Sequence, residues 1–507
     1  MAPNYDRPNH GISWNQSRAR HFKRKDIRPA DVDNVGAGTG DAAQDEKQMG
    51  AANGRSSGSS QLPMYNADGH RVNHAGHKVT PGIQPDGESG RSWFSPLHFF
   101  KIIWVSSCTA SKWTNVLWPF TIAAMVLHFV HGPELWIFIT AFIGMIPAAN
   151  LVGFAGQELA RKIPKVAGVL LETTFGSIVE IILFIVLLVN GRNQEGGNVQ
   201  IIRAAILGSI LANLLMCLGL CFFVGGIFHP QQTFHEAISE VGSNLMLVAG
   251  FGLVIPTIYY FSLEARATNE GTLAEITYNT TKLSRATAII LLIAFCVYVW
   301  FQARSHHGLY EDILEADEER DHDRHKDLVK PKLTLTESII ALLIALTFVS
   351  FMAIFLVQEI HYMVVERGIP DAFIGLILIP LVEKAAEHIT AIDEAYDNQM
   401  NFALSHVLGA SIQTALLNAP IVILVGWGIG VTNMSLNFES FDAIVLILAI
   451  IVVGNFLRDE KSDYLEGALC VMVYALIAVS AFYYPNPEGT MPASGEGAEA
   501  AHRLMFS

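Results

Sequence analysis

The chain has 507 residues, of which 51% are hydrophobic and only 16% are charged, and its formal net charge is −14. Its mean hydropathy is +0.35. This composition excludes an ordinary water-soluble globular protein. The negative charge argues against nucleic-acid binding, which needs a basic face. The five cysteines are scattered singly, so they indicate neither a disulfide framework nor a zinc site.

The first 92 residues are polar, rich in Gly, Asn, Asp, Ser and His, and lack apolar periodicity, so we expect residues 1–92 to form a disordered tail. No apolar segment follows Met1, which argues against a cleavable secretory signal and favours a cytosolic tail. Residues 93–113 contain an amphipathic stretch, Trp93–Trp104. This stretch either lies along the membrane surface or is simply the approach of the chain to its first span.

Apolar runs of membrane-spanning length recur after residue 113. Since about 20 apolar residues cross a bilayer as a helix, the pattern predicts an all-α polytopic membrane protein with about 11 transmembrane helices. The expected spans are residues 114–131, 134–154, 165–190, 200–227, 241–262, 284–303, 334–357, 369–396, 402–428, 438–457 and 464–484.

Two spans contain carboxylates, which are costly inside a bilayer and therefore indicate function. Glu180 lies near the centre of the third span and Glu387 at a comparable depth in the eighth. The two glutamates are five spans apart, an odd difference, so the second segment enters the membrane in the opposite direction. Inverted repeats bring matching elements together at the bilayer midplane. We therefore expect one leading helix followed by two inverted five-helix repeats, with the two glutamates facing each other.

These features divide the chain. We expect a leading helix at 114–133, a first repeat at 134–303, an acidic cytosolic loop or helix at 304–333, a second repeat at 334–484 and a C-terminal tail at 485–507. Lys and Arg are more frequent in the loops that follow even-numbered spans, which favours a cytosolic N-terminus. The acidic segment is either a solvated helix or a helix that attracts cations.

Each acidic span is followed by one that carries small and amide residues, from Gly208 to Asn213 and from Gly409 to Gln413. Carboxylate, hydroxyl, amide and carbonyl oxygens together suit a calcium-like cation. Two adjacent carboxylates in a poorly hydrated site are neutralised by a divalent cation or by protons, which therefore compete. Competition at one site predicts exchange of a cation for protons.

Two segments resemble motifs of a known family. Residues 168–180 (GVLLETTFGSIVE) and 380–388 (PLVEKAAEH) are similar to GGLLNATFGNAVE and PIVGNAAEH of the vacuolar calcium/proton exchangers, in the calcium/cation antiporter superfamily. The similarity continues through residues 205–211, 221–226, 283–291 and 404–413, and takes in most of residues 114–484.

The resemblance implies a multi-pass protein of the vacuolar membrane that exchanges a cytosolic cation, with Ca²⁺ as the first expectation, for protons of an acidic organelle. It gives Glu180 and Glu387 the role of binding metal cation and proton alternately, and places His388 beside the proton path. It also places Ser177, Asn213, Ser411 and Gln413 near the ion. No cofactor is implied; the expected partners are lipid, inorganic cations and protons.

The chain departs from the family pattern at several positions. Ser177 replaces an Asn, Glu383-Lys384 replaces Gly-Asn, and Glu172 replaces an Asn. Lys384 puts an ammonium beside the ion, where Glu383 is expected to compensate its charge. We regard Lys384, Glu383 and Glu172 as candidate selectivity residues, and Na⁺, K⁺ or Mn²⁺ remains an alternative cargo. Lys384 could instead form a structural ion pair with Glu383 or Glu172.

The residues also have simpler interpretations. Glu180 and Glu387 could be partners of buried amides, and His388 could complete a hydrogen-bond network. Further along the eighth span, Asp393, Glu394 and Asp397 are expected to be solvated, or else to line a cation vestibule, and His406 is expected to pack in the core.

Two other function classes were weighed. Residues 384–388 approach the inverted zinc-protease motif HxxEH, but Lys384 replaces the first histidine, and the chain has no HExxH, GxSxG or GxxxxGK[ST] motif. An enzyme is therefore not expected. A proton-independent cation channel also needs a polar midplane, and the carboxylate repeat favours the antiporter over it.

Overall fold

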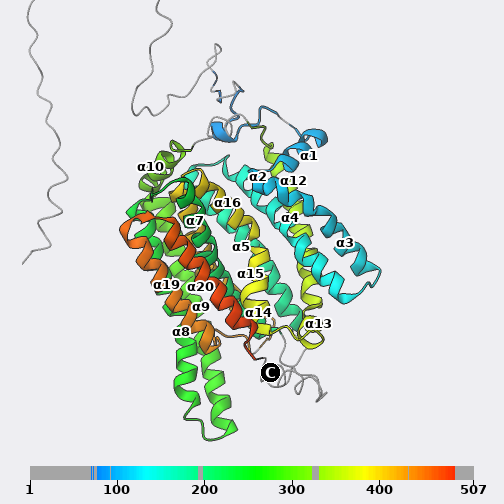
Figure 1. Cartoon of the computed structure of the whole chain (residues 1–507), viewed down its shortest axis with the longest axis vertical. Coiled ribbons are helices and arrows are strands. Elements are labelled where there is room, and N and C mark those ends of the chain that lie inside the picture. Colours follow the sequence, from blue (N-terminus) through cyan, green and yellow to red (C-terminus); the bar gives the residue numbers. More distant parts are fainter. Residues whose placement is uncertain are drawn as a thin grey trace, which may run out of the picture. The chain divides into compact units, whose positions relative to one another are not determined.

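The computed structural model describes residues 70, 72–73, 77–91, 93–191, 198–321, 330–431 and 433–485. Within these ranges, nine helices or continuous helical runs are long and apolar enough to cross a membrane. They fall on nine of the eleven predicted spans, and the prediction of an all-α polytopic membrane protein is confirmed (Figure 1). The nine are α4 (Glu134–Ala160), α5 (Lys165–Asn190), α6–η4–α7 (Val199–Leu211, Ala212–Cys217, Leu218–Phe228), α8 (Glu236–Glu264), α9–η5 (Glu270–Trp300, Phe301–Ser305), α12–α13 (Leu335–Gln358, Ile360–Val365), α17–η7–α18 (Met400–Gln413, Thr414–Asn418, Ala419–Gly428), α19–η8 (Ser440–Phe456, Leu457–Asp459) and α20 (Tyr464–Phe482).

The other two predicted spans consist of shorter helices. Residues 114–131 are covered by the end of α2 (Thr109–Thr114), η2 (Asn115–Leu117) and α3 (Trp118–Phe129). Residues 369–396 are covered by α14 (Asp371–Phe373), η6 (Ile374–Leu378), α15 (Ile379–Glu383) and α16 (Ala385–Tyr396).

The break between α15 and α16 lies at Lys384, whose backbone has φ −91° and ψ −3°. Two known causes of helix distortion precede it, the π-helical turn η6 and Pro380, which has no N–H to donate. The functional carboxylate predicted in this segment, Glu387, therefore lies in the first turn of a new helix.

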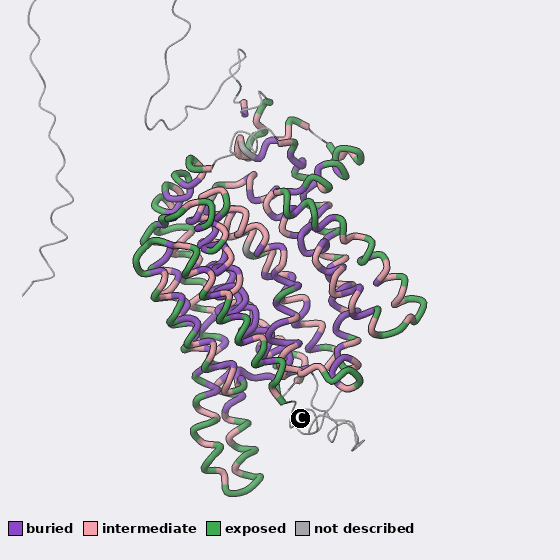
Figure 2. Tube along the Cα trace, viewed as in Figure 1, coloured by how far each residue is buried: buried purple, intermediate pink, exposed green. Residues whose placement is uncertain are grey.

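The third predicted span of each repeat has the same construction. In α6–η4–α7 and in α17–η7–α18, a π-helical turn interrupts the α-helix near its middle. Most residues of both runs are buried (Figure 2). The crossing of α6 with η6 is close, since a Cβ at Gly208 would overlap the carbonyl of Leu376. Such π-helical turns occur frequently at functional sites.

The segment before the first helix contacts the membrane domain. Lys162 Nζ donates to the carbonyl oxygens of Gly87 and Leu333, both at 2.8 Å, and Arg91 donates to Glu337. Burial lowers the pKa of Lys162. Residues 77–91, which the sequence assigns to a disordered tail, thus have defined contacts that include the short helix η1 (Pro85–Gly87). Residues 1–69, 71, 74–76 and 92 of that predicted tail lie outside the described residues, as does the predicted C-terminal tail beyond residue 485.

Helix α1 (Pro96–Val105) exposes large apolar side chains, among them Leu97, Phe100 and Trp104. Its position at the membrane surface remains a prediction.

The acidic segment at 304–333 forms α10 (His307–Glu318), and residues 322–329 lie outside the described part. Asp317 at its end is buried and accepts hydrogen bonds from the backbone N–H groups of Asn401 and Phe402, in the first turn of α17. Such N–H groups have no partner within their own helix. Burial raises the pKa of Asp317. The side chain of Asp317 therefore holds α10 against α17, a helix that contributes residues to the predicted site.

Two further features complete the described fold. The strands β1 (Gln232–Thr233) and β2 (Lys461–Ser462) pair antiparallel. Helices α8 and α9 form a hairpin whose connecting end is exposed (Figures 1 and 2).

Candidate functional site

Glu180 lies in the middle of α5 and is fully buried. Its Oε2 accepts hydrogen bonds from Thr414 Oγ1 and Asn418 Nδ2, both at 2.9 Å. Thr414 and Asn418 are the first and last residues of η7, so the π-helical turn supplies both donors. The same oxygen lies 2.9 Å from Lys384 Nζ. Glu180 is thus held by one ammonium and two neutral donors.

Lys384 joins the two predicted carboxylates. Its side chain is 1% exposed, and its Nζ lies 3.3 Å from Glu387 Oε2. Glu387 is 23% exposed and packs against Gly176 of α5, where a Cβ would overlap its Oε1. The ammonium of Lys384 therefore joins Glu180 and Glu387, and it comes from the point where the helix breaks. The three contacting groups carry a net formal charge of −1. Each carboxylate needs this partner because a buried charge without partners is very costly.

Glu383 makes no direct ion pair with Lys384 among the described residues, and its compensation of the Lys384 charge stays a prediction. Its Oε1 accepts a hydrogen bond from Ser209 on α6, and the described residues offer its Oε2 no hydrogen-bond donor. Glu172 is not the partner of Lys384 either, since its carboxylate faces His406. Both alternatives for a structural ion pair of Lys384 are replaced by the pairs with Glu180 and Glu387.

The remaining predicted residues form pairs around these acids. Ser177 Oγ donates to Gln413 Oε1 at 2.7 Å, and His388 Nε2 lies 3.0 Å from Asn213 Oδ1. Ser411 Oγ donates to a carbonyl of its own helix, that of Val407.

Several buried polar atoms of the site have no hydrogen-bond partner among the described residues. A buried polar atom without a partner costs free energy, so these atoms mark places for water or a bound ion. They include Glu180 Oε1, Glu383 Oε2, Glu387 Oε2, Asn213 Nδ2, His388 Nδ1 and Asn418 Oδ1.

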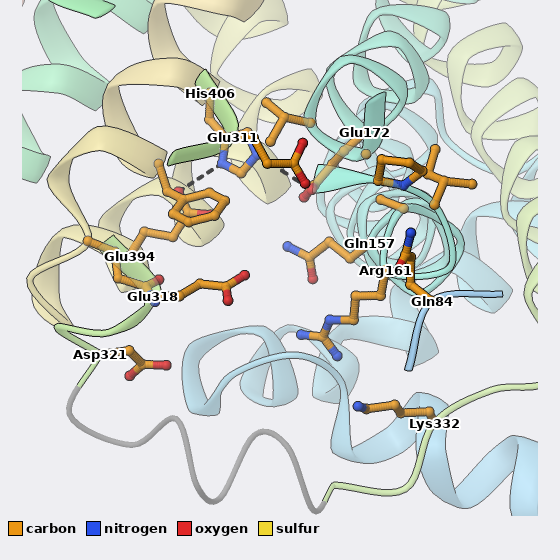
Figure 3. Close-up of a pocket in the computed structure, with 17 residues that line it drawn as sticks. Gln84, Gln157, Arg161, Glu172, Glu311, Glu318, Asp321, Lys332, Glu394 and His406 are labelled. Atoms are coloured by element: carbon orange, nitrogen blue, oxygen red, sulfur yellow. Dashed lines mark hydrogen bonds and ion pairs between the residues drawn. The ribbon is translucent and has the colours of Figure 1, made fainter. Parts of the chain in front are cut away.

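Two cavities lie next to each other at the site, and Glu387 lines one of them. The outer cavity has a volume of about 290 Å³ and is lined by residues that include Gln84, Gln157, Arg161, Glu311 and Glu318 (Figure 3). The inner cavity, of about 30 Å³, is lined by residues that include Gly176, Asn213, Glu387 and His388. Glu172 and His406 line both cavities. The two cavities therefore adjoin, and residues of α10 line the outer one.

The sequence profile of the family described as "Sodium/calcium exchanger protein" matches residues 133–304 and 337–483. The chain belongs to this family. The exchanger is 32% identical over 375 residues to Vacuolar cation/proton exchanger 2 of Arabidopsis thaliana, covering 74% of this chain and 81% of that relative. It is also 32% identical over 381 residues to the Vacuolar calcium ion transporter of Schizosaccharomyces pombe, covering 75% of this chain and 87% of that protein.

Solved structures agree on the fold of the exchanger. Native YfkE aligns with a TM-score of 0.58 at 24% identity and covers 73% of this chain and all of that one. The structure titled H⁺/Ca²⁺ exchanger CAX aligns with a TM-score of 0.50 at 14% identity, over 74% of this chain and 92% of that one.

Sequence reasoning missed several residues of the exchanger's site. Thr414 and Asn418 were not singled out, although a buried amide inside an apolar span is a usable signal. His406 was expected to pack in the core, and Glu394 to be solvated or to line a vestibule; their mutual contact at 2.8 Å was not expected. Glu394 does line the outer cavity. Only the fold shows which faces of α5, α16 and α17 meet.

Proposed function

We propose that this exchanger is a secondary active cation/proton antiporter that moves a cytosolic cation into an acidic organelle in exchange for protons. The observation that carries the proposal is the meeting of Glu180 and Glu387, from opposite halves of the chain, on one buried ammonium. The printed names of the relatives support it, since they include cation/proton exchangers, a calcium ion transporter and a Ca²⁺/H⁺ antiporter. Their vacuolar names support a vacuolar membrane for this chain. Enzymatic activity is not part of the proposal.

Exchange follows from competition at the paired glutamates. Cations and protons both neutralise carboxylates, so the binding of one disfavours the other. Glu387 receives them first because it lines the inner cavity, whereas Glu180 lies behind Lys384. Antiport further requires that the unloaded, charged site crosses between the two open states slowly. Ser177, Asn213, Gln413 and His388 supply neutral polar atoms around this site, and Ser411 lies on the same helix as Gln413.

The test uses the purified full-length chain in sealed vesicles with an imposed pH gradient. Adding the transported cation should dissipate the gradient, and Glu180→Gln or Glu387→Gln should stop this. Glu366→Gln, which changes an exposed carboxylate, is the matched control and should leave the rate unchanged. Cation flux that continues without any proton movement would identify a channel and refute antiport.

Ca²⁺ is the first candidate cargo because relatives are named for it. A monovalent cation, Na⁺ or K⁺, is the second, and Lys384 favours it. The ammonium already places one positive charge between Glu180 and Glu387, where a coordinated cation would bind. With Glu383 included, three carboxylates and one ammonium carry a net formal charge of −2, the same as the two glutamates alone. Mn²⁺ remains a further alternative.

The two cases are separated by assaying Ca²⁺, Mn²⁺, Na⁺ and K⁺ side by side in wild type and Lys384→Asn. Removal of the ammonium should shift the preference toward divalent cations. An unchanged preference would show that Lys384 does not set selectivity.

A further inference from the structure

A second group of ionisable side chains lies between the outer and inner cavities. His406 on α17 has its Nδ1 2.8 Å from Glu394 Oε2 on α16 and its Nε2 3.4 Å from Glu172 Oε2 on α5 (Figure 3). All three side chains are largely buried, with exposures of 10%, 15% and 18% for His406, Glu394 and Glu172. An imidazole is therefore held between two carboxylates that come from different helices.

This group lies where the outer and inner cavities adjoin. Glu394 lines the outer cavity, and Glu172 and His406 line both cavities, while Glu387 lines the inner one. A volume of about 30 Å³ is enough for one or two water molecules. Proton-bearing groups thus extend from the open side of the molecule to Glu387, with room for water in the last step.

A metal ion fits this group less well than a proton does. Nδ1 of His406 is already in hydrogen-bond contact with Glu394. The described residues contain no set of three His, Cys, Asp or Glu side chains arranged to hold a metal. A neutral imidazole, by contrast, accepts at one nitrogen while it donates from the other, which is the chemistry of a proton shuttle.

We propose that Glu394, His406 and Glu172 form a proton relay between the outer cavity and Glu387. In the inward direction, a proton from water binds the Glu394 carboxylate. It passes to Nδ1 as the O–H bond breaks, and the proton on Nε2 passes to Glu172. Water in the inner cavity then carries a proton from Glu172 to Glu387. Each group gains one proton and loses one, and the outward direction reverses the steps. This inference rests on the proposed antiport.

Other titratable groups face the relay and shape its pH dependence. Glu387 on α16 and Cys217 on η4 line the inner cavity, and Glu311 and Glu318 on α10 line the outer one. Asp393 neighbours Glu394 in the chain. A single pH profile therefore does not isolate His406, and a comparison of variants is needed.

The test compares wild type with His406→Gln in proteoliposomes, measuring cation-driven proton movement across a range of pH. Loss of the shuttle should slow proton movement by at least about tenfold, since positioned proton-transfer groups contribute roughly 10²–10⁴-fold in rate. It should also change the pH profile while leaving the cation concentration for half-maximal rate within about twofold. Free imidazole in the buffer should restore part of the rate.

His361→Gln on α13 is the control, because that histidine is exposed and lies outside both cavities; it should behave as wild type. Glu394→Gln keeps the side-chain volume and should repeat the defect, which covers the case in which His406→Gln fails to fold. A wild-type rate and pH profile in either folded variant would overturn the relay while antiport stands. Absence of cation-driven proton movement in wild type would instead overturn the proposed function.

Discussion

Lys384→Met tests whether the ammonium holds the site together. Methionine keeps an unbranched side chain but removes the charge that lies between Glu180 and Glu387. The contacts are 2.9 and 3.3 Å, and the lysine side chain is 1% exposed. The substitution therefore leaves two buried carboxylates without their shared counter-charge.

The magnitude follows from those distances. At an effective dielectric constant of about 20, unit charges at 2.9 and 3.3 Å attract by roughly 6 and 5 kcal/mol. Desolvation of the three groups offsets much of this attraction. Removal of one partner from a buried ion pair typically costs about 3–5 kcal/mol, so we expect Lys384→Met to lower the free energy of unfolding by that amount.

A double-mutant cycle isolates the interaction. The free energy of unfolding is measured by titrating detergent-solubilised protein with sodium dodecyl sulfate for wild type, Lys384→Met, Glu180→Gln and the double variant. The double variant should be more stable than the sum of the single changes predicts, by roughly 1–3 kcal/mol. The control is Lys112→Met at an exposed lysine, which should change the free energy by less than about 0.5 kcal/mol.

Additive effects of Lys384→Met and Glu180→Gln would refute the ion pair as a source of stability. A second readout uses linkage, because a ligand that binds the folded state alone stabilises it by about 2.7 kcal/mol at 100 times its dissociation constant. The transported cation should therefore raise the unfolding temperature of Lys384→Met more than that of wild type. An equal rise in both proteins would show that the cation does not take the place of the ammonium.

Three further changes have expected outcomes. Gly176→Ala should displace the Glu387 carboxylate and slow cation-driven proton movement while the protein still folds, as checked by transport rate and size-exclusion profile. Gly208→Ala should destabilise the fold by more than about 1 kcal/mol, because the new methyl meets the backbone of Leu376, and a thermal-shift measurement checks this. Burial raises the pKa of Asp317, so ionisation of this carboxyl opposes folding. The contribution of Asp317 to the free energy of unfolding is therefore full at acid pH, and it falls as pH rises through the pKa of the folded state. The unfolding free energy of wild type minus that of Asp317→Asn should therefore decrease with rising pH. A difference that grows with pH would contradict a raised pKa for Asp317.

Much of the fold was predictable because hydropathy and intramembrane charge are local signals. Within the part of the chain that the structure describes, apolar runs located nine helices that could cross a membrane, and the carboxylates inside two spans singled out Glu180 and Glu387. The odd difference between their span numbers, third and eighth, predicted that they meet, and they do so through Lys384. These inferences needed only the cost of burying charge and the direction of each span.

The contacts of the site were harder to predict because they depend on distortions of helix geometry. A regular helix turns about 100° per residue, so a π-helical turn or a break rotates every side chain that follows. The break at Lys384 separates Glu383, which meets Ser209, from Glu387, which meets the lysine. No sequence periodicity encodes that rotation, and for the same reason Asn418 was not recognised as a partner of Glu180.

The two glutamates are not equivalent in this structure, and the difference bears on coupling. Glu180 is fully buried, and its Oε2 contacts an ammonium and two neutral donors, whereas Glu387 borders the inner cavity. A cation entering from the outer cavity and a proton arriving through His406 would thus reach Glu387 before Glu180. Under the proposed antiport, competition would take place at one accessible carboxylate, and Lys384 would transmit its outcome to the second, since it contacts both. We therefore expect loss of either acid to stop exchange for a different reason: without Glu387 the arriving ions would have no ligand, and without Glu180 the ammonium would have no second anchor.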